Sequence, residues 1–179
     1  MEDRRLVKLS KYLSRHLRHD PGRLGLNLGP GGWVAVETLL AACAAHQVAL
    51  TRAELLEVIE RNDKQRFAVD AAGDRIRASQ GHSVPVDLGL EPRRPPATLF
   101  HGTGAGRIEA IRREGLRPVG RHHVHLSADA ATARRVGARH GTPVVLEVDA
   151  GAMAVAGVEF LRSDNGVWLV AAVPPDRLR

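Results

Sequence analysis

Apolar residues near the N-terminus follow the spacing of an amphipathic helix. Between about Arg4 and His19 they recur every three or four positions, at Leu6, Leu9, Leu13 and Leu17. The run Asp20-Pro21-Gly22 interrupts this pattern, so we expect the helix to end there. The leucines would then face a core, and the opposite face would carry cations.

Two shorter helices are predicted next. Trp33 to Ala35 has the character of a short strand, and the apolar residues after it predict a helix that includes Leu39, Leu40 and Cys43. Thr51 and Glu54 have the spacing of a capping box, in which each side chain bonds the other residue's backbone. We therefore expect a third helix to begin directly after Thr51.

The end of the first half alternates in the manner of a β-hairpin. Phe67 and Val69, and later Ile76 and Ala78, are separated by polar residues around a turn at Ala72-Gly73-Asp74. Three helices followed by a hairpin are typical of a winged-helix domain, a common nucleic-acid-binding design. We assign residues 1–82 to such a lobe, although a fold alone does not determine function.

A proline-rich stretch divides the chain. Residues 83–97 contain Pro85, Pro92, Pro95 and Pro96 and few periodic apolar positions, which predicts an extended connection. From residue 98 to residue 179 the pattern indicates short strands: Thr98–His101, His123–Leu126, Pro143–Asp149, Val158–Arg162 and Val167–Ala171. Helices are predicted over Gly106–Glu114 and Asp129–His140, each followed by a glycine. The fold class is therefore α+β, with two lobes.

Charge and composition narrow the choice of partner only slightly. The formal net charge is +6 over 179 residues, which favours a polyanion such as RNA or DNA. Arginine far outnumbers lysine, however, and a GC-rich genome would have the same effect. No apolar run is long enough to span a membrane, and the lone Cys43 excludes an intramolecular disulfide. We expect a cytoplasmic monomer that binds no membrane.

A basic helix face and a polar run carry the candidate chemistry of the first lobe. The first helix presents Arg15 almost opposite its leucines and His16 near their edge, which by itself describes either a solvated face or an anion site. The run from Asn62 to Phe67 places Arg66 just before the hairpin. Arginine binds phosphate oxygens in pairs, and histidine exchanges a proton near neutral pH. An arginine from the other lobe would complete such a phosphate site.

Polar residues gather at predicted strand ends in the second lobe. His101-Gly102-Thr103 ends one strand: the glycine would let a planar amide approach the backbone, and the threonine hydroxyl would suit a ribose. His123 and His125 alternate along another strand, with Ser127 beyond them. Their spacing does not match common zinc sites, so we predict a ligand-binding edge and no metal.

Taken together, these residues resemble the NAD-dependent RNA 2′-phosphotransferases, also called tRNA 2′-phosphotransferases. The similarity covers nearly the whole chain, and the joint order and spacing of its motifs are specific although each motif alone is weak. The motifs are Leu13-Ser14-Arg15-His16-Leu17-Arg18-His19, Gly32-Trp33-Val34, Asn62-Asp63-Lys64-Gln65-Arg66-Phe67, Leu99-Phe100-His101-Gly102-Thr103, Arg121, His123-Val124-His125-Leu126-Ser127, Val136-Gly137-Ala138-Arg139-His140-Gly141 and Ser163-Asp164-Asn165-Gly166-Val167-Trp168.

The resemblance implies a winged-helix RNA lobe and, at 98–179, an NAD-binding lobe of the ADP-ribosyltransferase type. It implies that an RNA 2′-phosphate attacks NAD, releasing nicotinamide, and that the ADP-ribose 2″-hydroxyl then attacks the phosphorus. The products are RNA with a 2′-hydroxyl and ADP-ribose 1″,2″-cyclic phosphate. The family's catalytic set falls on Arg15, His16, Arg66 and Arg121. Its NAD-contacting positions fall on His101, Gly102, Thr103, His125, Ser127 and Arg139.

Two other functions fit parts of this pattern. An ADP-ribosyltransferase acting on nucleic-acid terminal phosphates would use the first step alone and leave a stable adduct. A winged-helix DNA-binding regulator with an NAD-sensing lobe would bind duplex DNA and release no nicotinamide. The natural RNA substrate does not follow from the residues.

Overall fold

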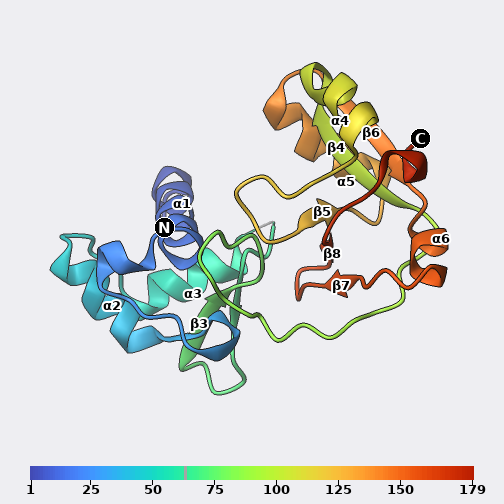
Figure 1. The fold of residues 1–179 in the computed structure, drawn as a ribbon. Helices are drawn as coiled ribbons and strands as arrows, with labels where there is room; N and C mark the ends of the chain where they lie inside the picture. The colour runs from blue at the N-terminus through green and yellow to red at the C-terminus, as the bar shows by residue number, and fades with distance from the viewer. Residues whose placement is uncertain (63) are drawn as a thin grey trace. The chain divides into compact units, whose positions relative to one another are not determined.

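The computed structural model describes residues 1–62 and 64–179, so Asp63 of the predicted phosphate-site run lies outside the described residues. The chain forms two compact units, Met1–Gly89 and Leu90–Arg179 (Figure 1). Over the described ranges the fold is α+β, with six α-helices and three small antiparallel sheets. In the same ranges no helix is long and apolar enough to cross a membrane.

The predicted helices of the first unit are confirmed. They are α1 (Asp3–Arg18), α2 (Val36–Ala45) and α3 (Arg52–Glu60). Leu9, Leu13 and Leu17 of α1 are buried in the core of this unit, as the leucine spacing predicts. Leu6, the first residue of the stripe, only packs against the edge of that core.

The predicted hairpin is also present, and it gains a third strand. Strand β2 (Phe67–Val69) pairs with β3 (Arg75–Ala78) in the register Phe67↔Ala78 and Val69↔Ile76. Strand β1 (Val34–Ala35) pairs with the other edge of β3, giving the order β1-β3-β2. The sequence predicts β1 but not its partner, because the two paired strands are about forty residues apart.

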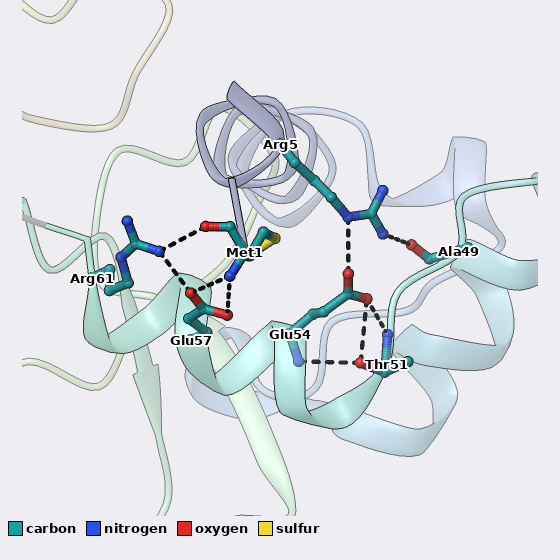
Figure 2. Close-up of polar contacts among 7 residues, drawn as sticks. All are labelled: Met1, Arg5, Ala49, Thr51, Glu54, Glu57 and Arg61. Carbon is teal, nitrogen blue, oxygen red and sulfur yellow. Dashed lines mark hydrogen bonds and ion pairs between the residues drawn. The ribbon is translucent and has the colours of Figure 1, made fainter. Parts of the chain in front are cut away.

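Ion pairs connect the N-terminal part of the chain to α3, and a capping box closes the start of α3 (Figure 2). The Met1 ammonium donates to both carboxylate oxygens of Glu57, at 2.9 and 3.2 Å. Arg5 donates to Glu54, whose other carboxylate oxygen accepts from the Thr51 backbone N–H at 3.0 Å. The Thr51 hydroxyl in turn accepts from the Glu54 N–H, so the predicted capping box is confirmed.

The second unit contains three helices and two sheets. The helices are α4 (Ile108–Glu114), α5 (Ala130–Gly137) and α6 (Ala150–Val155). Strand β4 (Leu99–Gly104) pairs antiparallel with β6 (Pro143–Val148), and β5 (Val124–Leu126), β8 (Trp168–Val170) and β7 (Leu161–Arg162) form a sheet in that order. Phe100 and Ser127 exchange backbone hydrogen bonds of 2.9 and 2.8 Å, which joins β4 to the segment after β5. This link places the predicted histidine motifs side by side.

Some elements of the second unit differ from the prediction. Helix α6 is absent from the predicted pattern, because its alanines show no apolar period; its N-cap, Asp149, accepts from the Ala152 N–H at 3.2 Å. The strand expected over Val158–Arg162 is present only as β7, Leu161–Arg162. The residues before it follow the turn after α6, in which Gly157 has a φ of +91°. Helix α5 begins one residue after Asp129, which caps it.

The proline-rich stretch is anchored at both of its ends. Ser83 donates its N–H to the Arg18 carbonyl at 2.9 Å, and the Asp87 carbonyl accepts from Gly31 at 3.1 Å, both within the first unit. Arg93 donates its N–H to the Phe160 carbonyl at 2.7 Å within the second. The division between the units, after Gly89, lies inside this stretch.

Candidate active site

The last turn of α1 carries two residues of the predicted phosphate site. Arg15 is exposed, and His16, its neighbour, is only 4% exposed. This difference follows from the helix period, because His16 lies beside the leucine stripe while Arg15 lies opposite to it. The ring of Tyr12 packs on the His16 imidazole with 4.5 Å between ring centroids. His16 is therefore held in one orientation by its surroundings.

One hydrogen bond decides which nitrogen of His16 can take part in chemistry. Nδ1 lies 3.0 Å from the backbone carbonyl oxygen of Asp20. A carbonyl only accepts, so Nδ1 carries a proton in this bond. Nε2 is then the ring nitrogen of His16 that this bond does not occupy.

Arg66 is held by its side chain and by its backbone. Its Nη1 donates to Asn62 Oδ1 at 3.2 Å. Its backbone carbonyl accepts from the Ser79 N–H at 2.9 Å, just before β2 begins. Ser79 also donates its hydroxyl to the carbonyl of Gln65 at 3.0 Å. The Arg66 side chain is half-buried.

A cavity of about 550 Å³ lies in the second unit, between β4, β5 and α4. Its walls combine apolar side chains, histidines and arginines. The lining residues are His101, Gly102, Thr103, Arg107, Ala110, Ile111, Glu114, Gly115, Leu116, Arg117, Pro118, Val119, Arg121, His123, Val124, His125, Val136 and His140. Among these lining residues Glu114 is the single carboxylate, and it pairs with Arg113 at 2.6 Å. The lining thus favours an anionic ligand.

Two histidines of the cavity wall are fixed in complementary tautomers. Nδ1 of His101 lies 3.2 Å from the His125 carbonyl oxygen and therefore donates to it. Burial lowers the pKa of His101, so its ring is neutral and Nε2 is an acceptor. Nδ1 of His125 lies 2.9 Å from Nη1 of Arg121, which only donates, so His125 carries its proton on Nε2. The two rings therefore carry their protons on opposite nitrogens.

Arg121 is a predicted catalytic residue that also lines this cavity. Its guanidinium lines the cavity and is anchored on His125. Partial burial, and then the positive charge of Arg139, lower the pKa of Arg121. Arginine nevertheless stays protonated in proteins. An anion beside Arg121 would relieve this repulsion.

Gly102 lines the cavity, and packing explains why it is a glycine. A Cβ at this position would lie 1.6 Å from the Ala133 carbonyl oxygen and 2.9 Å from the Gly137 nitrogen, both in α5. The missing side chain therefore lets α5 pack directly on β4 (Figure 1). This reason differs from the predicted one, in which the glycine admits a planar amide.

The structure brings most of the predicted NAD-contacting residues together. His101, Gly102, Thr103 and His125 line the cavity, whereas Ser127 and Arg139 are not among its lining residues. Ser127 is instead bonded through its backbone to Phe100, one residue from His101. Arg139 is exposed near the end of α5, where its charge still acts on Arg121.

With this geometry in place, comparison with known proteins identifies the family. The model of the "RNA 2'-phosphotransferase, Tpt1 / KptA family" matches residues 4–172. The chain belongs to this family. A "Probable RNA 2'-phosphotransferase" of Herpetosiphon aurantiacus is 60% identical over 175 residues, which cover 98% of this chain and 96% of that protein. Proteins of the same name from Streptomyces griseus and Trichormus variabilis are 61% and 58% identical over 182 and 178 residues. These alignments cover 98% and 99% of this chain and 96% and 98% of the relatives.

The predicted family is thus confirmed, and with it the predicted class of activity. RNA 2′-phosphotransferases of the Tpt1/KptA family are transferases that use NAD as co-substrate. The family match extends over both compact units, so each of them contains part of what the family shares.

Sequence reasoning did not single out two cationic residues of the RNA 2′-phosphotransferase cavity. Arg107 follows β4 in a short 3₁₀ turn, and Arg117 follows Gly115 at the end of α4. Both come from loops next to the predicted motifs, and isolated arginines in an arginine-rich chain carry no local signal. They line the cavity because of where the folded chain places the two ends of α4, which the sequence pattern does not show.

The predicted absence of a metal remains a prediction. Among residues 1–62 and 64–179, no three histidine, cysteine, aspartate or glutamate side chains are grouped as a metal site would need. Two histidines of the cavity have other partners: His101 contacts a carbonyl oxygen and His125 a guanidinium.

Proposed function

We propose that this chain removes a 2′-phosphate from RNA by transferring it to NAD, with Arg15, His16, Arg66 and Arg121 as its catalytic residues. The observation that supports this best is the cavity of the second unit, whose histidine tautomers and arginines suit the ribose hydroxyls and pyrophosphate of a dinucleotide. The family match supplies the class of reaction.

In the first step, a nonbridging oxygen of the RNA 2′-phosphate forms a bond to the nicotinamide-bearing ribose carbon of NAD. The bond to nicotinamide breaks and its electron pair leaves with the ring. The nucleophile is already anionic, so this step needs orientation more than a strong base. The acceptor Nε2 of His101 would accept a hydrogen bond from a ribose hydroxyl, and the Thr103 hydroxyl would bond to the ribose as well.

In the second step, the ADP-ribose 2″-hydroxyl gives up its proton to solvent as its oxygen bonds to the phosphorus, and the bond from phosphorus to the RNA 2′-oxygen breaks. Negative charge builds on the phosphoryl oxygens, and we assign its stabilisation to Arg15, Arg66 and Arg121. Protonated His16 donates its Nε2 proton to the leaving oxygen, in keeping with the Nδ1 bond to Asp20. The products are RNA with a 2′-hydroxyl and ADP-ribose 1″,2″-cyclic phosphate.

The identities of the lobes are part of the same proposal. We assign residues 1–82 to a winged-helix RNA-binding lobe, 83–97 to a connection and 98–179 to an NAD-binding lobe of the ADP-ribosyltransferase type. The β2–β3 hairpin after three helices, with β1 paired to β3, supports the first assignment. We also propose that the enzyme is a cytoplasmic monomer that needs no metal, and that Ser127 and Arg139 contribute to NAD binding.

The test uses an oligoribonucleotide with one internal 2′-phosphate, incubated with and without NAD. The proposal predicts nicotinamide release and a 2′-hydroxyl product only when NAD is present. A matched oligonucleotide with a 5′-terminal phosphate and no 2′-phosphate distinguishes this activity from ADP-ribosylation of a terminal phosphate. A stable ADP-ribosylated end on this second substrate, with the 2′-phosphate of the first untouched, would replace the proposal by a terminal-phosphate ADP-ribosyltransferase.

A further inference from the structure

A buried amide links the guanidinium of Arg66 to the helix that carries Arg15 and His16. Asn62 is only 5% exposed although it follows α3 in a polar run. Its Nδ2 donates to the Ser10 hydroxyl in α1 at 3.0 Å. Its Oδ1 accepts from Arg66 Nη1 and from the Lys64 backbone N–H, each at 3.2 Å.

These contacts use both ends of the Asn62 side chain. Buried polar groups are normally satisfied, and here the partners are a helix hydroxyl on one side and an arginine head on the other. Ser10 lies five positions before Arg15 in α1, so it belongs to the same rigid element as the proposed catalytic pair. Asn62 therefore connects the Arg66 guanidinium to that helix.

The chemistry of the amide matters as much as its position. An arginine side chain has many rotamers, and fixing its head in advance removes an entropic cost from phosphate binding. A carboxylate at position 62 would fix the head equally well but would offset its charge. A neutral amide oxygen orients Arg66 without adding a negative charge beside the proposed phosphate site.

We propose that Asn62 is a positioning residue for the attack on phosphorus, acting through Arg66. This inference rests on the proposed function, because it requires Arg66 to stabilise the second step. Loss of Asn62 should then slow the second step selectively, whereas a purely structural defect would lower both steps together by reducing the folded fraction.

The experiment follows single turnover of 2′-phosphorylated RNA, measuring nicotinamide release and the adduct of ADP-ribose on the RNA 2′-phosphate. Asn62→Ala should slow the second step about 10- to 100-fold, the range expected when a reacting group is misplaced. Nicotinamide release should change less than about threefold, so the adduct accumulates. The matched control is Asn27→Ala, since Asn27 is exposed and should leave both steps unchanged.

A double-mutant cycle decides whether Asn62 acts through Arg66. Asn62→Ala should cost less than about twofold in an Arg66→Ala background, because the group that it positions is already absent. Full additivity, near-normal turnover of Asn62→Ala, or equal slowing of both steps would overturn the inference. If Asn62→Ala does not fold, Ser10→Ala takes its place, because it removes only the hydroxyl that accepts from Asn62. It should likewise slow the second step more than nicotinamide release, and equal rates for both steps would overturn the inference.

The same assay separates this inference from the proposed function. Wild-type enzyme that leaves the 2′-phosphate in place, or Arg66→Ala with normal turnover, refutes the proposed function or its residues. A slow Arg66→Ala beside a normal Asn62→Ala leaves the proposed function standing and refutes only the positioning role.

Discussion

Replacing Gly102 by alanine tests how the packing of β4 on α5 shapes the cavity of the second unit. The added Cβ would lie 1.6 Å from the Ala133 carbonyl oxygen and 2.5 Å from its carbonyl carbon. Carbon and oxygen atoms that are not bonded stay more than about 3 Å apart, so α5 would have to move by roughly 1.5 Å. Both partners are backbone atoms, and rotation of a side chain cannot relieve the clash.

The expected cost is large for a single methyl group. Overpacking typically costs about 1–3 kcal/mol, and a clash between backbone elements belongs at the upper end of that range. About 3 kcal/mol corresponds to a fall of roughly 12–24 °C in the melting temperature of a domain of this size. Because His101 and Thr103 flank Gly102 in the cavity wall, NAD binding should weaken as well.

The matched control is Gly106→Ala, in the turn directly after β4. A Cβ at Gly106 meets no atom within 4 Å, so its melting temperature should stay within a few degrees of wild type. The assay is thermal unfolding followed by calorimetry, with an NAD titration well below the transition. If Gly102→Ala melts as wild type does and binds NAD equally well, our account of this packing is wrong.

Four further outcomes follow from individual contacts. Thr51→Ala should lower the free energy of unfolding by about 1 kcal/mol through loss of the helix cap, while Thr51→Ser should restore most of it in denaturant titrations; equal effects would exclude the cap. The hydrogen bond from Arg5 lowers the pKa of Glu54 to about 2, so this carboxylate stabilises the fold above its ordinary value of 4.5 and the contribution disappears as the pH falls toward 2. Arg5→Ala should flatten that part of the stability curve, and an unchanged curve would contradict the pairing. Burial lowers the pKa of His101 below its ordinary 6.5, so the unfolded chain takes up a proton first and stability falls as the pH drops below 6.5; His101→Ala should remove this decline and weaken NAD binding with little effect on RNA affinity. A chelator should leave turnover unchanged, and a loss restored by added metal would show that a metal is required.

The sequence predicts those parts of the fold that depend on local pattern. The leucine spacing of α1, the capping box at Thr51 and the alternation around Gly73 each act within a few residues, and all three appear in the structure. Helix α6 was not predicted, because its residues show no apolar period and Asp149, its N-cap, was assigned to the end of a strand. Pairing of β1 with β3 depends on the folded chain and has no local signature.

The candidate site divides in the same way. The family motifs place His101, Thr103, His125 and Arg121, which the structure assembles around one cavity. The tautomers of the histidines depend on a carbonyl and a guanidinium that approach from other residues, so no motif could predict them. The burial of Asn62 within a polar run was equally hidden, because Ser10, its partner, is 52 positions away.

The fate of a labelled phosphate tests the central claim most directly. RNA carrying ³²P in a single internal 2′-phosphate is incubated with the enzyme and NAD, and the products are separated by chromatography. Our account predicts that the label leaves the RNA and appears in ADP-ribose 1″,2″-cyclic phosphate, with one nicotinamide released for each phosphate transferred. Label recovered as inorganic phosphate, or label that leaves the RNA without NAD, would contradict it.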